Sequence, residues 1–282
     1  MSSNSGTLWI VATPLGNPGD LSPRARETLA RADGILAEDT RRTGLLLAAC
    51  GVEARRLTSV HEHNEAERLP KTLELLRQGE ELALVSDAGT PLLSDPGYRL
   101  VRACRDQGIR VAPVPGPSAP VAALSASGLP PYPFVFLGFA PRKKGEREAF
   151  FSPYAALPAT LIFFERKDRL CATLGSALSV LGDRDACIAR ELTKTYEEFL
   201  PFRLSAHAAL PGELLGEITV LIGPPDANSR TDAATADAVL REESALGGKA
   251  REVAQRAKER LAGWTVKELY ARLSAGGGGH GA

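Results

Sequence analysis

Most residues that could do chemistry lie in short polar or glycine-rich stretches that each follow an apolar run in the first half of the chain. The densest stretch, residues 86–97, reads SDAGTPLLSDPG. Its Asp87 comes directly after a buried apolar run, where a carboxylate is costly without a partner. We therefore expect Asp87 to accept hydrogen bonds from loop N–H groups or from a ligand hydroxyl or amine. Glycine and proline in this loop let backbone approach a small molecule closely.

Two further turns share this glycine- and proline-rich character. TPLGNPGDLS begins at residue 13, and PGPSA begins at residue 115. Neither is a GxGxxG sequence, and the chain has no GxxxxGK[ST], so a dinucleotide fingerprint, an ordinary Rossmann methyltransferase loop and a P-loop are all unsupported. One such turn alone is usually structural. Three that converge on one cleft are hard to explain by packing alone.

Charged and imidazole groups follow two other apolar runs. EDTRR, residues 38–42, is either a surface ion-pair cluster with a helix cap at Thr40 or Thr43, or a group that positions a phosphate or hydroxyl. HEHN, residues 61–64, places two histidines on one side of an extended segment. Zinc needs a further ligand, and none has suitable spacing, so we expect no metal and favour neutral histidines that line a cleft.

A parallel α/β sheet would bring these loops together, because its ligands bind at the carboxyl ends of the strands. Apolar runs alternate with helical patterns over the first 128 residues and predict strands at 7–12, 34–38, 56–60, 82–86 and 110–114. Helices are predicted at 22–32, 64–78 and 96–107. The first of them has a serine cap and a proline at its first position.

The second half is also predicted to be mixed α/β. LPPYP, residues 129–133, cannot continue a helix and suggests a domain boundary. Strands are predicted at 134–139, 160–164, 186–191 and 217–222, with a helix at 168–181. Residues 223–237 have the composition of a linker, and the terminal GGGGHGA is expected to be disordered. The predicted units are an N-terminal α/β domain at 7–128, a C-terminal α/β domain at 129–225, and a linker with a helical basic tail at 226–282.

Composition limits the functions that this 282-residue chain can have. Its hydrophobic content of 44% excludes general disorder, and its 34 basic and 34 acidic residues give a net charge of zero. Contact with RNA would therefore depend on local basic segments such as PRKKGER, residues 141–147, and the tail at 249–272. Each segment could equally be a charged surface that contacts only solvent.

The chain has features of a cytoplasmic protein. Four cysteines without a CxxC pair are expected to be reduced and in apolar surroundings, with neither a disulfide nor a zinc site. Neither a signal peptide nor an apolar run of membrane-spanning length is visible, so we expect a soluble protein of the cytoplasm.

Six strings together resemble the small-subunit ribosomal RNA 2'-O-methyltransferases of the tetrapyrrole methylase superfamily. They are LWIVATPLGNPGDLS, AEDTRRTGLLL, HEHN, LVSDAGTPLLSDPGYRLV, PVPGPSA and ARELTKTYEE. The resemblance covers nearly all of residues 7–222, and the order and number of the strings make it specific. It implies two α/β domains with S-adenosylmethionine in the cleft between them, and a homodimer. It also implies methylation of the ribose 2'-oxygen of a cytidine in the decoding region of 16S rRNA.

The resemblance also implies which residues form the site. Expected cofactor contacts are Leu15, Asp87, Thr90, Ser118, Ala119, Phe164 and Ala189. Methyl transfer requires alignment at ~3 Å and removal of the hydroxyl proton. The catalytic candidates that would face the cleft are Asp39, Arg41, His63 and Lys194, with no single base chosen. Expected substrate contacts are Arg42, His61, Asn64, Arg142, Lys143 and Lys144. The string ERKDR, residues 165–169, departs from the serine-proline-histidine arrangement expected there.

Three other functional classes remain open at this point. A methylase of small tetrapyrroles would need a large apolar or arginine-lined cavity, whereas EDTRR and HEHN offer polar groups. A protein methylase similar to diphthine synthase fits SDAGTP and ARELTK poorly. A non-enzymatic RNA-binding or assembly factor would bind the cofactor without turnover.

Overall fold

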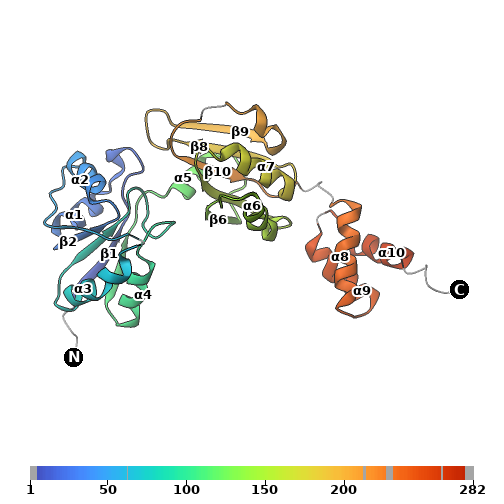
Figure 1. The fold of residues 1–282 in the computed structure, drawn as a ribbon, viewed down its shortest axis with the longest axis horizontal. Coiled ribbons are helices and arrows are strands. Elements are labelled where there is room, and N and C mark those ends of the chain that lie inside the picture. The colour runs from blue at the N-terminus through green and yellow to red at the C-terminus, as the bar shows by residue number, and fades with distance from the viewer. Residues whose placement is uncertain (1–4, 62, 212–213, 227–230, 262, 277–282) are drawn as a thin grey trace.

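A computed structural model describes residues 5–61, 63–211, 214–226, 231–261 and 263–276. Over these residues the chain forms two five-stranded sheets, followed by the helices of the C-terminal region (Figure 1). This α/β architecture with a helical C-terminal region confirms the predicted fold class. Glu62 of HEHN and the predicted disordered end from residue 277 onward lie outside the described residues.

The first sheet is parallel and has the strand order β3-β2-β4-β1-β5. Its strands are β1 (Thr7–Val11), β2 (Gly34–Ala37), β3 (Leu57–Ser59), β4 (Leu82–Val85) and β5 (Arg110–Val114). They agree with the predicted strands to within one residue at every end. The sheet places β1 between β4 and β5, so the loops that follow these three strands leave the same edge side by side.

Helices cover both faces of this sheet. They are α1 (Pro23–Arg31), α2 (Thr40–Ala49), α3 (Glu65–Arg77) and α4 (Tyr98–Asp106). Successive residues of β4 show why the strand is apolar throughout: Ala83 and Val85 pack with α1 and α2, whereas Leu82 and Leu84 pack with α3 and α4. The predicted cap of α1 is confirmed, since Ser22 Oγ accepts a bond from Ala25 N at 3.1 Å.

The second sheet is mixed and has the order β6-β7-β10-β8-β9. Its strands are β6 (Phe134–Phe139), β7 (Thr160–Glu165), β8 (Asp185–Arg190), β9 (Glu198–Arg203) and β10 (Ile218–Ile222). One face packs on α6 (Lys144–Phe151) and α7 (Leu170–Leu181) through a core that includes Phe151, Phe163 and Leu174. The other face packs on α5 (Ala119–Ala126) through Ala123 and Leu124. Helix α5 thus connects the two sheets (Figure 1).

The structure corrects several expectations for the second half. The predicted linker at 223–237 ends too late, because α8 (Ala233–Ala245) begins inside it. Asp232 caps this helix by accepting bonds from the N–H groups of Ala234 and Thr235. The basic segment PRKKGER at 141–147 contains the start of α6 rather than forming a solvated turn throughout. Strand β9 was not predicted: its Pro201 argues against a central strand, and β9 lies at the sheet edge, where proline is tolerated.

An acidic residue of the C-terminal helices pairs with part of the basic charge that was expected there. Helix α8 packs with α9 (Ala250–Arg260) and α10 (Val266–Gly276) around Trp264 and Leu269. Glu243 is 5% exposed and pairs with Arg256 at 2.9 Å and Arg260 at 2.8 Å. These two arginines of the tail therefore hold the helices together rather than forming a free cationic surface.

The structure also bears on the expectations for the four cysteines and for membrane-spanning helices. All four cysteines are free thiols, but Cys171 is exposed, contrary to the expectation of apolar surroundings for each. Within the described ranges, no helix combines the length and apolar character needed to cross a membrane.

Candidate functional site

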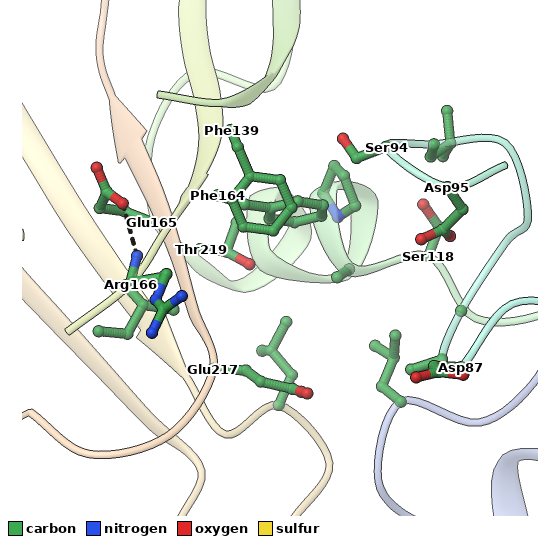
Figure 2. A pocket seen from close by; sticks show the side chains of 18 of the residues that line it. Asp87, Ser94, Asp95, Ser118, Phe139, Phe164, Glu165, Arg166, Glu217 and Thr219 are labelled. Carbon is green, nitrogen blue, oxygen red and sulfur yellow. Dashed lines mark hydrogen bonds between the residues drawn. The ribbon is translucent and has the colours of Figure 1, made fainter. Parts of the chain in front are cut away.

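A cavity of about 700 Å³ lies between the carboxyl edge of the first sheet and the second sheet. This volume is within the range of roughly 300–1,000 Å³ that is typical of small-molecule sites. Figure 2 shows Asp87, Asp95 and Ser118 on the first-sheet side, with Arg166 and Glu217 across the cavity from them. The aromatic rings of Phe139 and Phe164, 5.3 Å apart, lie between these two groups.

The three glycine- and proline-rich loops meet at this cavity, as predicted. Thr13 and Gly89 exchange backbone hydrogen bonds of 2.8 and 3.0 Å, which join the loops after β1 and β4. Thr90 Oγ1 donates to Pro117 O at 2.9 Å and joins the loops after β4 and β5. Gly89 has a φ of +78°, and an added Cβ would lie 3.0 Å from Leu15 Cδ2. Glycine is therefore needed for both the turn and the close contact.

The predicted cofactor residues fall mainly on the cavity wall. Leu15, Asp87, Thr90, Ser118, Ala119 and Phe164 all line it. Ala189 does not: it lies on β8, is 1% exposed and packs in the apolar cluster behind the wall. Ser118 precedes α5 but makes no side-chain cap bond, and its buried Oγ has no hydrogen-bond partner. An unpaired hydroxyl at a cavity wall fits a polar group of a ligand.

Three carboxylates, Glu38, Asp87 and Asp95, form an acidic side of the cavity. Burial and then the nearby Glu38 carboxylate raise the pKa of Asp95 to about 6. Burial and then Asp87 also raise the pKa of Glu38, although Arg42 and His61 act in the opposite direction. This side therefore holds groups that can exchange a proton near neutral pH.

Asp87 connects the acidic side to the EDTRR segment. Its Oδ2 accepts a bond from Arg42 at 2.9 Å, and its Oδ1 accepts a bond from Asp39 N at 3.3 Å. Arg42 does not itself line the cavity. The predicted substrate residue Arg42 and the predicted cofactor residue Asp87 are therefore one ion pair, and a change in either affects the other.

Asp39 is the N-terminal cap of α2, where the sequence suggested Thr40 or Thr43. Its Oδ1 accepts bonds from Arg41 N at 2.8 Å and Arg42 N at 3.4 Å. The side-chain hydrogen bond from Arg41 is the main reason that the pKa of Asp39 falls to about 2. Such a carboxylate is a poor proton acceptor, and neither Asp39 nor Arg41 lines the cavity. The geometry argues against a catalytic role for Asp39.

The histidine segment lies behind the acidic side. Neither His61, His63 nor Asn64 lines the cavity. Asn64 Oδ1 accepts a bond from His61 N at 2.8 Å, and its Nδ2 donates to Ser59 O at 3.2 Å, so Asn64 fixes the turn that precedes α3. His61 is close enough to Glu38 to lower the pKa of that carboxyl. Among the residues that the structure describes, no group of His, Cys, Asp and Glu could hold a metal ion.

Lys194 lies where the loop after β8 contacts the loop after β1. Its Nζ donates to Glu191 at 3.0 Å and to the cavity residue Glu217 at 3.1 Å. Gly16 packs so closely that an added Cβ would lie 2.3 Å from Lys194 Cγ. Thr193 Oγ1 accepts a bond from Asn17 N at 3.1 Å. These contacts make Lys194 a positioning residue between the sheets, not a group that lines the cavity.

The three basic residues expected to contact RNA also lie outside the cavity lining. Lys143 pairs with Glu146 at 3.0 Å, and Lys144 pairs with Glu148 at 3.8 Å. Arg142 is exposed, and its backbone oxygen accepts a bond from Arg147. Arg147, the last residue of the PRKKGER segment expected to contact RNA, is only 7% exposed, because α6 turns it toward α7.

Sequence reasoning missed most of the second-sheet side. The lining residues that it did not single out as contacts include Asp95, Phe139, Arg166, Lys167, Glu217 and Thr219. Asp95 was visible in the SDPG string. Arg166 and Lys167 belong to the atypical ERKDR string and follow β7 directly. Their position at the end of a strand was the sequence feature that could have identified them as cavity residues.

Comparisons with known proteins agree with this architecture. Residues 7–207 match the family of tetrapyrrole (corrin/porphyrin) methylases. A Mesorhizobium japonicum protein named ribosomal RNA small subunit methyltransferase I is 47% identical over 270 residues, which cover 94% of this chain and 90% of that protein. A protein of the same name from Escherichia coli O157:H7 is 50% identical over 215 residues, 76% of this chain and 72% of that protein.

A solved structure shares the fold. The uroporphyrin-III C-methyl transferase of Thermus thermophilus, complexed with S-adenyl homocysteine, aligns with a TM-score of 0.56. The alignment covers 77% of this chain and 97% of that chain at 19% sequence identity.

Proposed function

Because this chain belongs to the tetrapyrrole (corrin/porphyrin) methylase family, we propose that it is an S-adenosylmethionine-dependent methyltransferase that acts on ribosomal RNA of the small subunit. The observation that carries the proposal is the 47% identity, over 94% of the chain, to a protein named for that activity. The cavity between the sheets supplies the site at which donor and acceptor would meet.

The residues present fit S-adenosylmethionine. Leu15 and Phe164 offer apolar surface for its adenine ring, and the unpaired Ser118 Oγ offers a partner for a hydroxyl or amine. The acidic side, with Asp87, suits a ligand that carries a sulfonium and an ammonium group. When bound, the cofactor supplies an activated methyl group. The chain must then orient the acceptor hydroxyl and remove its proton.

The acceptor in this proposal is the ribose 2'-hydroxyl of a cytidine in the decoding region of 16S rRNA, and such an enzyme works in the bacterial cytoplasm. The six strings quoted above support this finer assignment. Arg41, Lys143 and Lys144 have side chains that are 77–90% exposed and would be available to phosphates. With zero net charge on the chain, recognition depends on folded RNA within the subunit.

The experiment that tests this function transfers labelled methyl groups from S-adenosylmethionine to purified 30S subunits that lack the modification. We expect label in the RNA, and we expect nuclease digestion with mass spectrometry to identify it as 2'-O-methylcytidine. Subunits that already carry the modification serve as the control and should accept no label. Bound cofactor without transfer to RNA would overturn the ribosomal assignment and favour a small-molecule acceptor or a non-enzymatic role.

The acidic side of the cavity argues against a tetrapyrrole acceptor. Such pigments carry acidic side chains, and a site for them would need an apolar or arginine-lined cavity. Glu38, Asp87 and Asp95 would repel carboxylates on the first-sheet side, which leaves only Arg166 and Lys167 on the opposite side to receive them. A nucleoside hydroxyl, which is neutral and must lose a proton, is compatible with this wall.

We also propose that the protein is a homodimer, as the resemblance implies. Strand β6 lies at an edge of the second sheet, and Phe134 on it is 42% exposed while the preceding Tyr132 is 83% exposed. An exposed aromatic edge of this kind suits contact with a second copy. Light scattering coupled to gel filtration should give twice the chain mass of 29.9 kDa. A monomer mass at micromolar concentration would contradict the proposal.

A further inference from the structure

The loop that carries Asp95 is held in an unusual backbone conformation. Leu92 and Ser94 both have a φ of +73°, which is a left-handed conformation that is unfavourable for a residue with a side chain. Ser94 Oγ lies 3.3 Å from the position that a Cβ on Gly138 of β6 would take, so the loop is packed against the second sheet. The result is that Asp95 is placed on the cavity wall, near Ser118 and Asp87 (Figure 2).

Apart from Glu38, the other carboxylates that line the cavity are already engaged. Asp87 is paired with Arg42, and both oxygens of Glu165 accept hydrogen bonds, from Arg166 N and Thr173 Oγ1 among others. Across the cavity, Asp168 is paired with Arg166, and Glu217 with Lys194. Within the described residues, the lining carboxylates that make no ion pair are Glu38 and Asp95.

The surroundings of Asp95 distinguish it from Glu38. The charged and polar groups nearest to Asp95 are Glu38 at the end of β2 and Ser86 and Asp87 after β4. Glu38 has Arg42 and His61 beside it, which stabilise its charge. Arg166 lies on the far side of the cavity from Asp95 (Figure 2), and Lys167, which also lines the cavity, follows it in the chain. Asp95 therefore lacks a neighbouring cation that would hold its proton affinity low.

Building on the proposed function, we propose that Asp95 is the catalytic residue that accepts the proton of the acceptor's ribose hydroxyl during methyl transfer. In this step the O–H bond breaks, the proton moves to a carboxylate oxygen of Asp95, and the electron pair remains on the ribose oxygen. That oxygen forms the new bond to the methyl carbon, while the electron pair of the breaking carbon–sulfur bond remains on sulfur. The carboxylate and the sulfonium charges both disappear, which favours the step wherever the surroundings are less polar than bulk water.

The proton affinity of Asp95 suits this role. A general base works best when its pKa lies near the working pH. Burial, with Glu38 next in importance, raises the pKa of Asp95 to about 6. Asp95 is then charged and able to accept a proton above that pH, and it is protonated and inactive below it. The rate of transfer should therefore rise with pH through about 6 and become constant above it.

The test compares Asp95→Asn with the unchanged protein in methyl transfer to unmodified 30S subunits. We expect a loss of about 100-fold or more in the transfer rate, since general bases contribute roughly 10²- to 10⁴-fold. Asp106→Asn, an exposed substitution at the end of α4, is the matched control and should transfer methyl groups at the normal rate. The remaining activity of Asp95→Asn should no longer rise with pH through about 6.

Calorimetric binding of S-adenosylmethionine to each variant provides a readout that does not depend on turnover. We expect Asp95→Asn to bind the cofactor with unchanged affinity. If the affinity falls in parallel with the rate, Asp95 is a cofactor ligand and the proposal is wrong. If Asp95→Asn does not fold, the pH dependence of the unchanged protein tests the proposal by itself. A transfer rate that does not change with pH across about 6 overturns the proposal.

The same experiment separates this proposal from the proposed function. Unchanged protein that labels the RNA, together with a fully active Asp95→Asn, removes Asp95 as the base and leaves the function standing. Unchanged protein that binds cofactor but leaves the RNA unlabelled removes the function and, with it, the ribose proton that Asp95 would accept.

Discussion

Glu165→Ala is expected to lower the free energy of unfolding by about 3–5 kcal/mol, which is the usual cost of removing one partner of a buried ion pair. Glu165 is 2% exposed at the end of β7. Its Oε1 accepts bonds from Arg166 N at 2.7 Å and from Arg169, and its Oε2 accepts a bond from Thr173 Oγ1 at 2.6 Å. Alanine would leave these donors, which belong to the segment between β7 and α7 and to α7 itself, without this acceptor.

Urea unfolding followed by circular dichroism measures this loss. Glu146→Ala is a matched control, because the exposed pair of Glu146 with Lys143 should contribute only about 0–1 kcal/mol. Glu165→Gln should be intermediate, since an amide oxygen can still accept some of the bonds. If Glu165→Ala and Glu146→Ala have the same unfolding midpoint, the network around Glu165 does not stabilise the second sheet as argued.

Asp87→Ala is expected to weaken binding of S-adenosylmethionine by about 10- to 100-fold, the effect of losing a hydrogen bond to a charged group worth roughly 1.5–3 kcal/mol. The Asp87 side chain is 25% exposed, lines the cavity and is held by Arg42 at 2.9 Å. Its carboxylate is therefore fixed in position before a ligand arrives, so no ordering cost reduces its contribution.

Arg42→Ala provides the comparison for Asp87→Ala. The Arg42 side chain is 69% exposed, and loss of an exposed pair costs about 0–1 kcal/mol, or up to about fivefold in affinity. The sequence assigned Arg42 to the substrate contacts and gave no reason to expect an effect on cofactor affinity, but the ion pair with Asp87 predicts a small decrease. Calorimetry of both variants measures the two effects. Unchanged affinity in Asp87→Ala would remove Asp87 from the cofactor site.

The first-sheet side of the cavity could be predicted from sequence because of a simple geometric rule. Loops after neighbouring parallel strands meet at one edge, so Asp87, Thr90 and Ser118 could be assigned to a common cleft from their positions after apolar runs. The family resemblance pointed to the same residues. It could not reveal the pairing of Asp87 with Arg42, since that contact joins a loop residue to a residue of α2 that is distant in the sequence.

The second-sheet side was less predictable for physical reasons. Its sheet is mixed, so chemistry-bearing residues leave from both ends of strands and strand position no longer identifies them. Pro201 prevented the prediction of β9, because proline is disfavoured within strands. The alanine-rich start of α8 has a composition similar to that of a linker. In the first domain the EDTRR string was ambiguous, because a helix cap such as Asp39 and a catalytic acid have the same local sequence.

The left-handed residues that border the cavity also bear on the protein's thermostability and its evolution. Within the described chain, every non-glycine residue with positive φ belongs to one of two loops beside the cavity: Leu92, Ser94, Glu191 and Thr193. Glycine or asparagine at these positions would raise the free energy of unfolding, because both residues adopt a positive φ more easily. The same substitutions would loosen the loops that hold Asp95 and Lys194 in place. Variants adapted to high temperature should therefore gain stability elsewhere, and these loops should be the last to change.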